Sequence, residues 1–168
     1  MSYEINIIAI NQDKPIQQPF FNSSILLHNE KENIDISRYV EIWPFFSATK
    51  GILYSLVVEM NEGYYSAFPL CDSDFDVSLP EDMLLIKVLE EERENLTAFI
   101  IKETYYKDFV KLVKFLIENA PNKRILFQTR YQGGDKELVI GVIKWTEFLT
   151  MLAQKQIFFN ICYIIEED

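Results

Sequence analysis

The stretch TYYKDFVKLVKFLIENAPNKRILFQTRY, residues 104–131, contains the two patterns that decide the fold. In residues 104–119 apolar side chains recur at intervals of three and four, which is typical of an amphipathic helix. Thr104 is expected to cap this helix, and Pro121 to end it, because proline cannot donate the next hydrogen bond. Residues 124–131 follow as a β-strand. The expected buried face of the helix is Tyr106, Phe109, Val110, Val113, Leu116 and Ile117.

Downstream of this stretch, the pattern continues as strand, helix and strand. Residues 132–135 (QGGD) contain paired glycines and predict a hairpin turn into a strand over residues 137–144 (ELVIGVIK). Residues 145–154 predict a short second helix, and residues 157–165 (IFFNICYII) predict a central strand, because nearly every position is apolar. A hairpin followed by a buried strand is therefore expected at the C-terminal end.

Upstream, the sequence predicts mainly strands. Residues 3–10 (YEINIIAI) and 51–60 (GILYSLVVEM) are apolar and β-branched, residues 11–22 form a loop, and residues 24–28 form a short strand. Residues 61–63 predict a turn, and the extended residues 64–70 would complete a hairpin. For the next segment two interpretations remain open: strands over 84–89 and 97–102, or a helix over 81–95.

This order of elements has few helices, and both come late in the chain. A doubly wound parallel sheet needs a helix between successive strands, so that fold is excluded. The length of 168 residues fits one domain. We expect a single α+β domain over residues 1–168, with a largely antiparallel sheet and two helices packed on one face.

Acidic residues are concentrated in one segment. The chain has 26 acidic and 16 basic residues, for a net charge of −10, and residues 61–100 hold 10 of the acids and 2 of the bases. This excess argues against nucleic-acid binding, which depends on clustered lysine and arginine. The sequence has no secretion signal and no apolar run long enough to span a membrane. It predicts a soluble cytoplasmic protein.

The acidic segment and its aromatic neighbours are the candidate partner-binding site. Carboxylates grouped in this way raise the rate of association with a basic protein, and exposed aromatic residues anchor interfaces. The competing interpretations are a solvated acidic loop and ordinary hairpin packing. The candidates are Asp72, Asp74, Asp76, Glu81, Asp82, Glu90, Glu91, Glu92, Glu94, Tyr64, Tyr65 and Phe75.

Motifs for catalysis and cofactors are lacking. The alternating acids from Asp72 resemble the start of a calcium loop, but Val77 and Met83 replace the glycine and glutamate that such a loop needs. His28 is the only histidine, and the glycine pair at 133–134 precedes a strand rather than a helix. We expect no enzyme activity, no cofactor and no metal; a metal-assisted enzyme using residues 72–82 is the less favoured alternative.

The whole chain resembles the small immunity proteins of bacterial polymorphic-toxin and contact-dependent inhibition systems. The features that carry this resemblance are the small acidic domain, the acid-dense residues 71–94, and the C-terminal pattern RILFQTRYQGGDKELVIGVIKWTEFL…NICYIIEED. It implies a cytoplasmic protein that binds one cognate toxin, often a basic nuclease, and blocks it. The alternative is a general protein-interaction module with another partner.

Overall fold

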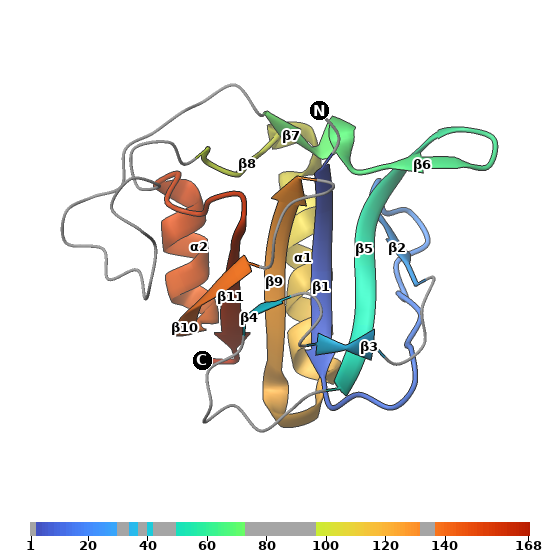
Figure 1. Ribbon diagram of the computed structural model, residues 1–168. Coiled ribbons are helices and arrows are strands. Elements are labelled where there is room, and N and C mark those ends of the chain that lie inside the picture. The colour runs from blue at the N-terminus through green and yellow to red at the C-terminus, as the bar shows by residue number, and fades with distance from the viewer. Residues whose placement is uncertain (1–2, 30–33, 37–39, 42–49, 73–96, 132–136) are drawn as a thin grey trace.

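A large mixed sheet forms the centre of the molecule (Figure 1). The structure is a computed structural model that describes residues 3–29, 34–36, 40–41, 50–72, 97–131 and 137–168. The strand order in the sheet is β2 (Leu26–His28), β5 (Lys50–Asn61), β1 (Tyr3–Ile10), β9 (Arg124–Tyr131), β11 (Ile161–Glu166), β10 (Glu137–Lys144) and β4 (Val40–Glu41).

Three shorter pairings complete the strands. β3 (Ile34–Asp35) and β6 (Tyr64–Ser66) each pair antiparallel with β5. β7 (Cys71–Asp72) pairs with β8 (Ile100–Ile101) in a small separate sheet. All pairs of the large sheet are antiparallel except β10 with β11 and β10 with β4.

The first strand shows why the sheet is apolar on both faces. In β1 the side chains of Ile5 and Ile7 point to one face and those of Ile8 and Ile10 to the other, because strand side chains alternate. The first pair joins the main core and the second pair joins a smaller cluster with Leu53. The continuous apolar runs therefore correspond to strands that are covered on both sides.

The two helices, α1 (Glu103–Asn119) and α2 (Trp145–Ala153), cover the same face of the sheet. Buried residues of both belong to the main core, and Figure 1 shows α1 behind β9 and β1 with α2 next to β11. Phe127 of β9 contacts Phe109 of α1 and Phe148 of α2, with ring centroids 5.9 Å and 5.2 Å apart. The predicted α+β fold with two helices on one face is confirmed.

The predicted hairpin between residues 124–131 and 137–144 is wrong, although both strands have the predicted bounds. β11 lies between β9 and β10, pairing antiparallel with the first and parallel with the second. A parallel pair needs a crossover, and α2 supplies it as the helix of a β10–α2–β11 unit. The physical reason is burial: Ile161–Glu166 is buried at five of its six positions, so it takes the central place.

Helix α1 differs from prediction at its start and in one side chain. It begins at Glu103 with Lys102 as the N-cap, so Thr104 lies inside the first turn and does not cap it. Tyr106 is 38% exposed, whereas Leu112 is fully buried, which shifts the buried face by part of a turn. The end before Pro121 is confirmed.

Two other strands are shorter than predicted. Residues 68–70 form a 3-10 turn containing Pro69 instead of continuing the strand. Residues 157–160 precede β11 without being part of it, because Asn160 has a positive φ of 63°. Of the alternatives for the acidic region, Ile100 and Ile101 are extended as predicted, and residues 81–95 lie outside the described residues.

Candidate functional site

The hairpin formed by β5 and β6 projects beyond the end of the sheet (Figure 1). Its turn is Glu62-Gly63, and Gly63 has a φ of 79°, a conformation that favours glycine. The pairing shifts register between Glu59 and Asn61, which leaves Met60 as an extra residue. Such a bulge increases the local twist and bends the strand away from the sheet. We call residues 59–68 the aromatic–acidic hairpin.

The base of this hairpin is fixed to the core. The Tyr3 hydroxyl donates a hydrogen bond to the Phe68 carbonyl at 2.8 Å, and the two rings lie 5.9 Å apart. The Ser66 hydroxyl accepts a hydrogen bond from the Phe68 amide at 3.1 Å, and Ala67 is buried. The hairpin is therefore a projecting element on a fixed support, which suits a recognition surface.

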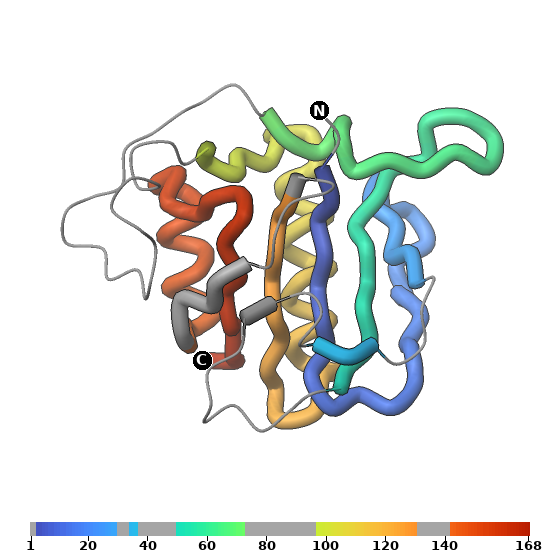
Figure 2. The backbone as a smooth tube through the Cα atoms, in the orientation of Figure 1, coloured from blue at the N-terminus to red at the C-terminus, as the bar shows by residue number. Residues whose placement is uncertain are grey.

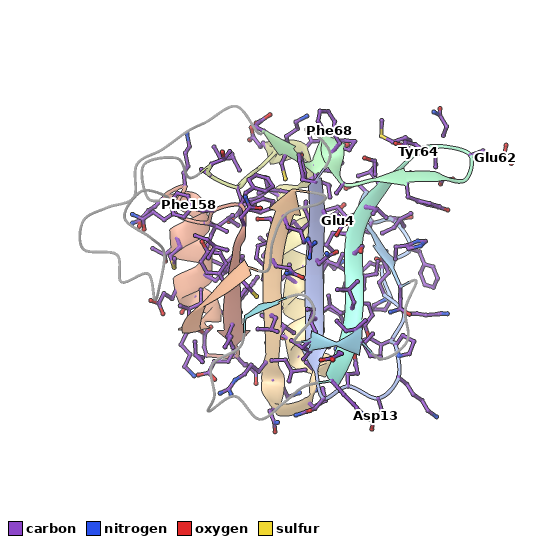
Figure 3. All side chains as sticks on the ribbon, viewed as in Figure 1. Glu4, Asp13, Glu62, Tyr64, Phe68 and Phe158 are labelled. Carbon is purple, nitrogen blue, oxygen red and sulfur yellow. The ribbon has the colours of Figure 1, made fainter. Side chains whose placement is uncertain are left out.

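Large apolar side chains of the hairpin face solvent. Tyr64 is 61% exposed and Tyr65 is 40% exposed. These are the two aromatic candidates from the sequence that the structure describes, and they are exposed rather than packed into the hairpin. Figure 3 places Tyr64 and Phe68 at the same end of the molecule, with Glu62 at the hairpin tip. Met60 and Phe68 extend this surface, at 49% and 57% exposure.

Acidic side chains lie among these aromatic ones. Glu59 is exposed and is the cross-strand partner of Tyr65. Glu62 is exposed in the turn, and Asp72 is exposed on β7. Figure 1 shows β6 and β7 at the same end of the molecule. Asp72 is thus the one predicted acid that the structure describes, and it lies at the hairpin end.

The other predicted acids lie between residues 72 and 97, and the structure describes the chain on either side of them. Cys71 pairs with Ile101, and Asp72 pairs with Ile100, so the two short strands that flank this segment, β7 and β8, lie side by side. The predicted residues between these flanks are outside the described residues. They are Asp74, Phe75, Asp76, Glu81, Asp82, Glu90, Glu91, Glu92 and Glu94.

Sequence reasoning missed three exposed apolar residues. Met60 is the last residue of the apolar run 51–60, but it is exposed at the register shift of the hairpin. Phe68 precedes Pro69, which was a signal that the strand stops there. Phe21 is 100% exposed in the turn after Phe20, while Phe20 packs on Phe115. The adjacent phenylalanines gave no sign of which one would face solvent.

The two cysteines of the chain, Cys71 and Cys162, are both buried. Burial raises the pKa of the Cys71 thiol to about 12. A thiol of this kind is a poor nucleophile, because the thiolate is the reactive form. His28 is half-buried, and its ring centroid is 5.6 Å from that of Tyr65. Within the described ranges no three His, Cys, Asp or Glu residues are grouped to hold a metal ion.

Comparisons with protein-family models, with curated proteins and with solved structures find no match for this chain. Neither helix in the described part of the chain has the length and apolar character that crossing a membrane requires.

Proposed function

We propose that this chain is a non-enzymatic binding protein that inhibits a basic partner, as an immunity protein does for a toxin domain. One observation carries the proposal: Tyr64 and Tyr65 are exposed on a projecting hairpin whose base is fixed to the core. Tyrosine is enriched among the residues that dominate interface energy, because its ring buries a large area at a small cost in entropy.

The charge distribution supports a basic partner. Residues 61–100 hold 10 acidic and 2 basic residues, and the described acids Glu59, Glu62 and Asp72 are exposed at the hairpin end. Opposite charge on the partner accelerates the encounter and disfavours other partners. In this mechanism the acids bring the basic protein to the surface, and Tyr64 and Tyr65 then pack against it. The resemblance to immunity proteins suggests a toxin nuclease as that partner.

Capture of the partner tests the proposal. The tagged protein is incubated with lysate and with secreted protein from its own source, at about 50 mM and about 500 mM salt, which changes the screening length several-fold. The variant Tyr64→Ser removes the most exposed hairpin tyrosine, and Tyr106→Ser on α1 is the matched control. We expect the native chain and the control to retain a basic protein at low salt, and the hairpin variant to lose it.

The captured protein must also be inhibited. The proposal is supported if the toxic or nuclease activity of the captured protein falls when the native chain is added. The activity should not fall when the Tyr64→Ser variant is added instead. A captured protein without toxic activity would favour the general interaction module instead. Capture that is equal for the native chain and the hairpin variant, or no capture at all, would overturn the proposal.

The role of the acids has its own test. Replacing Asp72, Asp74 and Asp76 by lysine should slow association with the partner at least about tenfold at low salt, because steering acts mainly on the association rate. The difference should shrink at high salt. Glu118→Lys, a reversal of an exposed acid on α1, is the control. Unchanged rates and unchanged salt dependence in the triple variant would contradict the steering mechanism.

A further inference from the structure

A pocket of about 490 Å³ opens at the edge of the sheet, beside the aromatic–acidic hairpin. It lies between residues 15–18, strand β2 and the side chain of Tyr65. Figure 2 shows the loop that contains residues 15–18 passing along the outer side of β5 next to β2. The pocket therefore shares Tyr65 with the surface proposed to bind the partner.

One wall of the pocket is held by a buried tyrosine. The Ile16 amide donates a hydrogen bond to the Tyr54 hydroxyl at 3.0 Å, and that hydroxyl donates to Gln12 Oε1 at 2.5 Å. Tyr54 is completely buried in β5. This pair of hydrogen bonds ties the loop to the sheet.

The same loop is tied to β2 by Gln18. Its Oε1 accepts a hydrogen bond from the Leu27 amide at 3.1 Å, and its Nε2 donates to the Ile25 carbonyl at 3.3 Å. The carboxamide thus pairs with two backbone groups on the outer side of the edge strand, as the backbone of another strand would. With both ties in place, the pocket exists before any ligand arrives, which lowers the entropic cost of binding.

The lining combines three kinds of surface. Ile16 and Leu26 are apolar, His28 and Tyr65 present aromatic rings, and Gln17 presents a carboxamide. None of the described lining residues is lysine or arginine. This combination of apolar side chains, aromatic rings and neutral polar groups suits a ligand with a hydrocarbon stem and a flat polar end.

The charges around the pocket select the sign of that polar end. Glu59, the cross-strand partner of the rim residue Tyr65, is exposed, and Glu62 is exposed in the turn of the same hairpin. Asp13 and Lys14, which precede the lining segment, have opposite charges and largely offset one another. Among the described charges beside the pocket the acidic ones are therefore in excess, which favours a cation and disfavours a phosphate or carboxylate ligand.

We propose that this pocket receives an arginine side chain of the basic partner. The guanidinium plane stacks on the ring of Tyr65, the methylene groups lie along Ile16 and Leu26, and the N–H groups donate to neutral oxygens of the lining. Arginine fits better than lysine, because its flat, weakly hydrated head stacks on aromatic rings while the ammonium of lysine holds its water. The inference rests on the proposed function, since it assumes a basic protein partner.

A titration that needs no partner tests it. The full ¹⁵N-labelled chain is titrated with N-acetylarginine amide, and the amide signals of residues 16–18 and 26–29 are followed by NMR. We expect saturable shifts confined to these residues, and affinity for N-acetyllysine amide about three- to fivefold weaker. Tyr65→Leu should abolish the saturable shifts, and Tyr106→Leu, which removes a tyrosine of similar exposure outside the pocket, should retain them.

Tyr54→Phe tests the preformed wall. Tyr54 acts here as a positioning residue, so its variant should weaken arginine amide binding while the native fold, followed by the shifts of the α2 amides, is unchanged. The inference is overturned if the native chain shows no saturable shift, if the lysine amide binds as well, or if Tyr65→Leu binds normally. Capture of a partner together with a failed titration would refute the pocket alone, and a successful titration without capture would refute the partner proposal alone.

Discussion

Ser24 donates two hydrogen bonds to one carboxylate oxygen of Asp108, from its amide at 2.8 Å and from its hydroxyl at 2.6 Å. This contact joins the loop before β2 to helix α1 across 84 residues of sequence. It is reinforced nearby, where the ammonium of Lys111 lies 4.1 Å from the ring centre of Phe20. The loop that carries one wall of the pocket is therefore fixed to the helix layer as well as to the sheet.

The hydrogen bonds from Ser24 hold the pKa of Asp108 below its usual value. A carboxylate with a lowered pKa in the folded state stabilises the protein above its unfolded pKa, near pH 4, and this contribution is lost as the pH falls through the folded pKa. Asp108→Asn should therefore cost about 0.5–1 kcal/mol at pH 7 and much less near pH 3. Urea unfolding at both pH values measures the difference.

Glu118→Gln is the matched control for Asp108, because its contact with Lys114 is a long, exposed ion pair at 3.8 Å. Its cost should stay within about 0.5 kcal/mol at either pH. A pH-independent cost for Asp108→Asn would contradict the assignment of the two hydrogen bonds to the charged form.

Glu166 joins the ends of three strands through two cations. Its Oε2 lies 2.7 Å from Arg124 Nη2 on β9, and its Oε1 lies 2.7 Å from Lys144 Nζ on β10. Glu166→Gln should lower the unfolding free energy by about 1 kcal/mol at low salt, because it leaves two cations together without their carboxylate. At about 1 M salt the difference from the native protein should mostly disappear, because the Debye length is then only about 3 Å and the exposed charges are screened from one another. A loss that does not depend on salt would show that packing, and not charge, is responsible.

Gly51 is required by a close approach between β5 and β1. A Cβ atom at this position would lie 2.7 Å from the carbonyl oxygen of Ala9, which is part of the paired strand. Gly51→Ala should therefore cost about 2–3 kcal/mol, because backbone must move to relieve the contact. Gly63→Ala is the comparison: nothing lies within 4 Å of its Cβ, so only its positive φ opposes the change, at about 1 kcal/mol. Equal costs, measured by chemical unfolding, would contradict the close approach.

Phe127 is the centre of an aromatic cluster in the main core. It is completely buried, and its ring lies 5.5 Å from that of Phe99. Phe127→Ala should cost about 3–5 kcal/mol, because it leaves a cavity between the sheet and both helices. Phe21→Ala removes the same side chain where it is fully exposed, and it should change the unfolding free energy by less than about 0.5 kcal/mol. Comparable losses in the two variants would contradict the packing described here.

The sequence by itself determined most elements, because each depends on a local period. The 3.6-residue period of α1 and the apolar runs of β1, β5 and β11 are visible in a single chain, and their bounds agree with the structure to within a few residues. Tyr64 and Tyr65 were also singled out from the sequence, because they lie next to the acidic segment. Their exposure was decided by the structure.

Tertiary structure alone decided which strands are neighbours. The turn-like residues 132–135 suggested a hairpin, but β11 separates β9 from β10, because burying Ile161–Glu166 between two strands removes more apolar surface from water than a local hairpin would. The pocket was also beyond sequence reasoning: Tyr54, Gln18 and Tyr65 come from three segments, and only long-range packing brings them together. Local periodicity is encoded in neighbouring residues, whereas the site depends on contacts between residues that are distant in the chain.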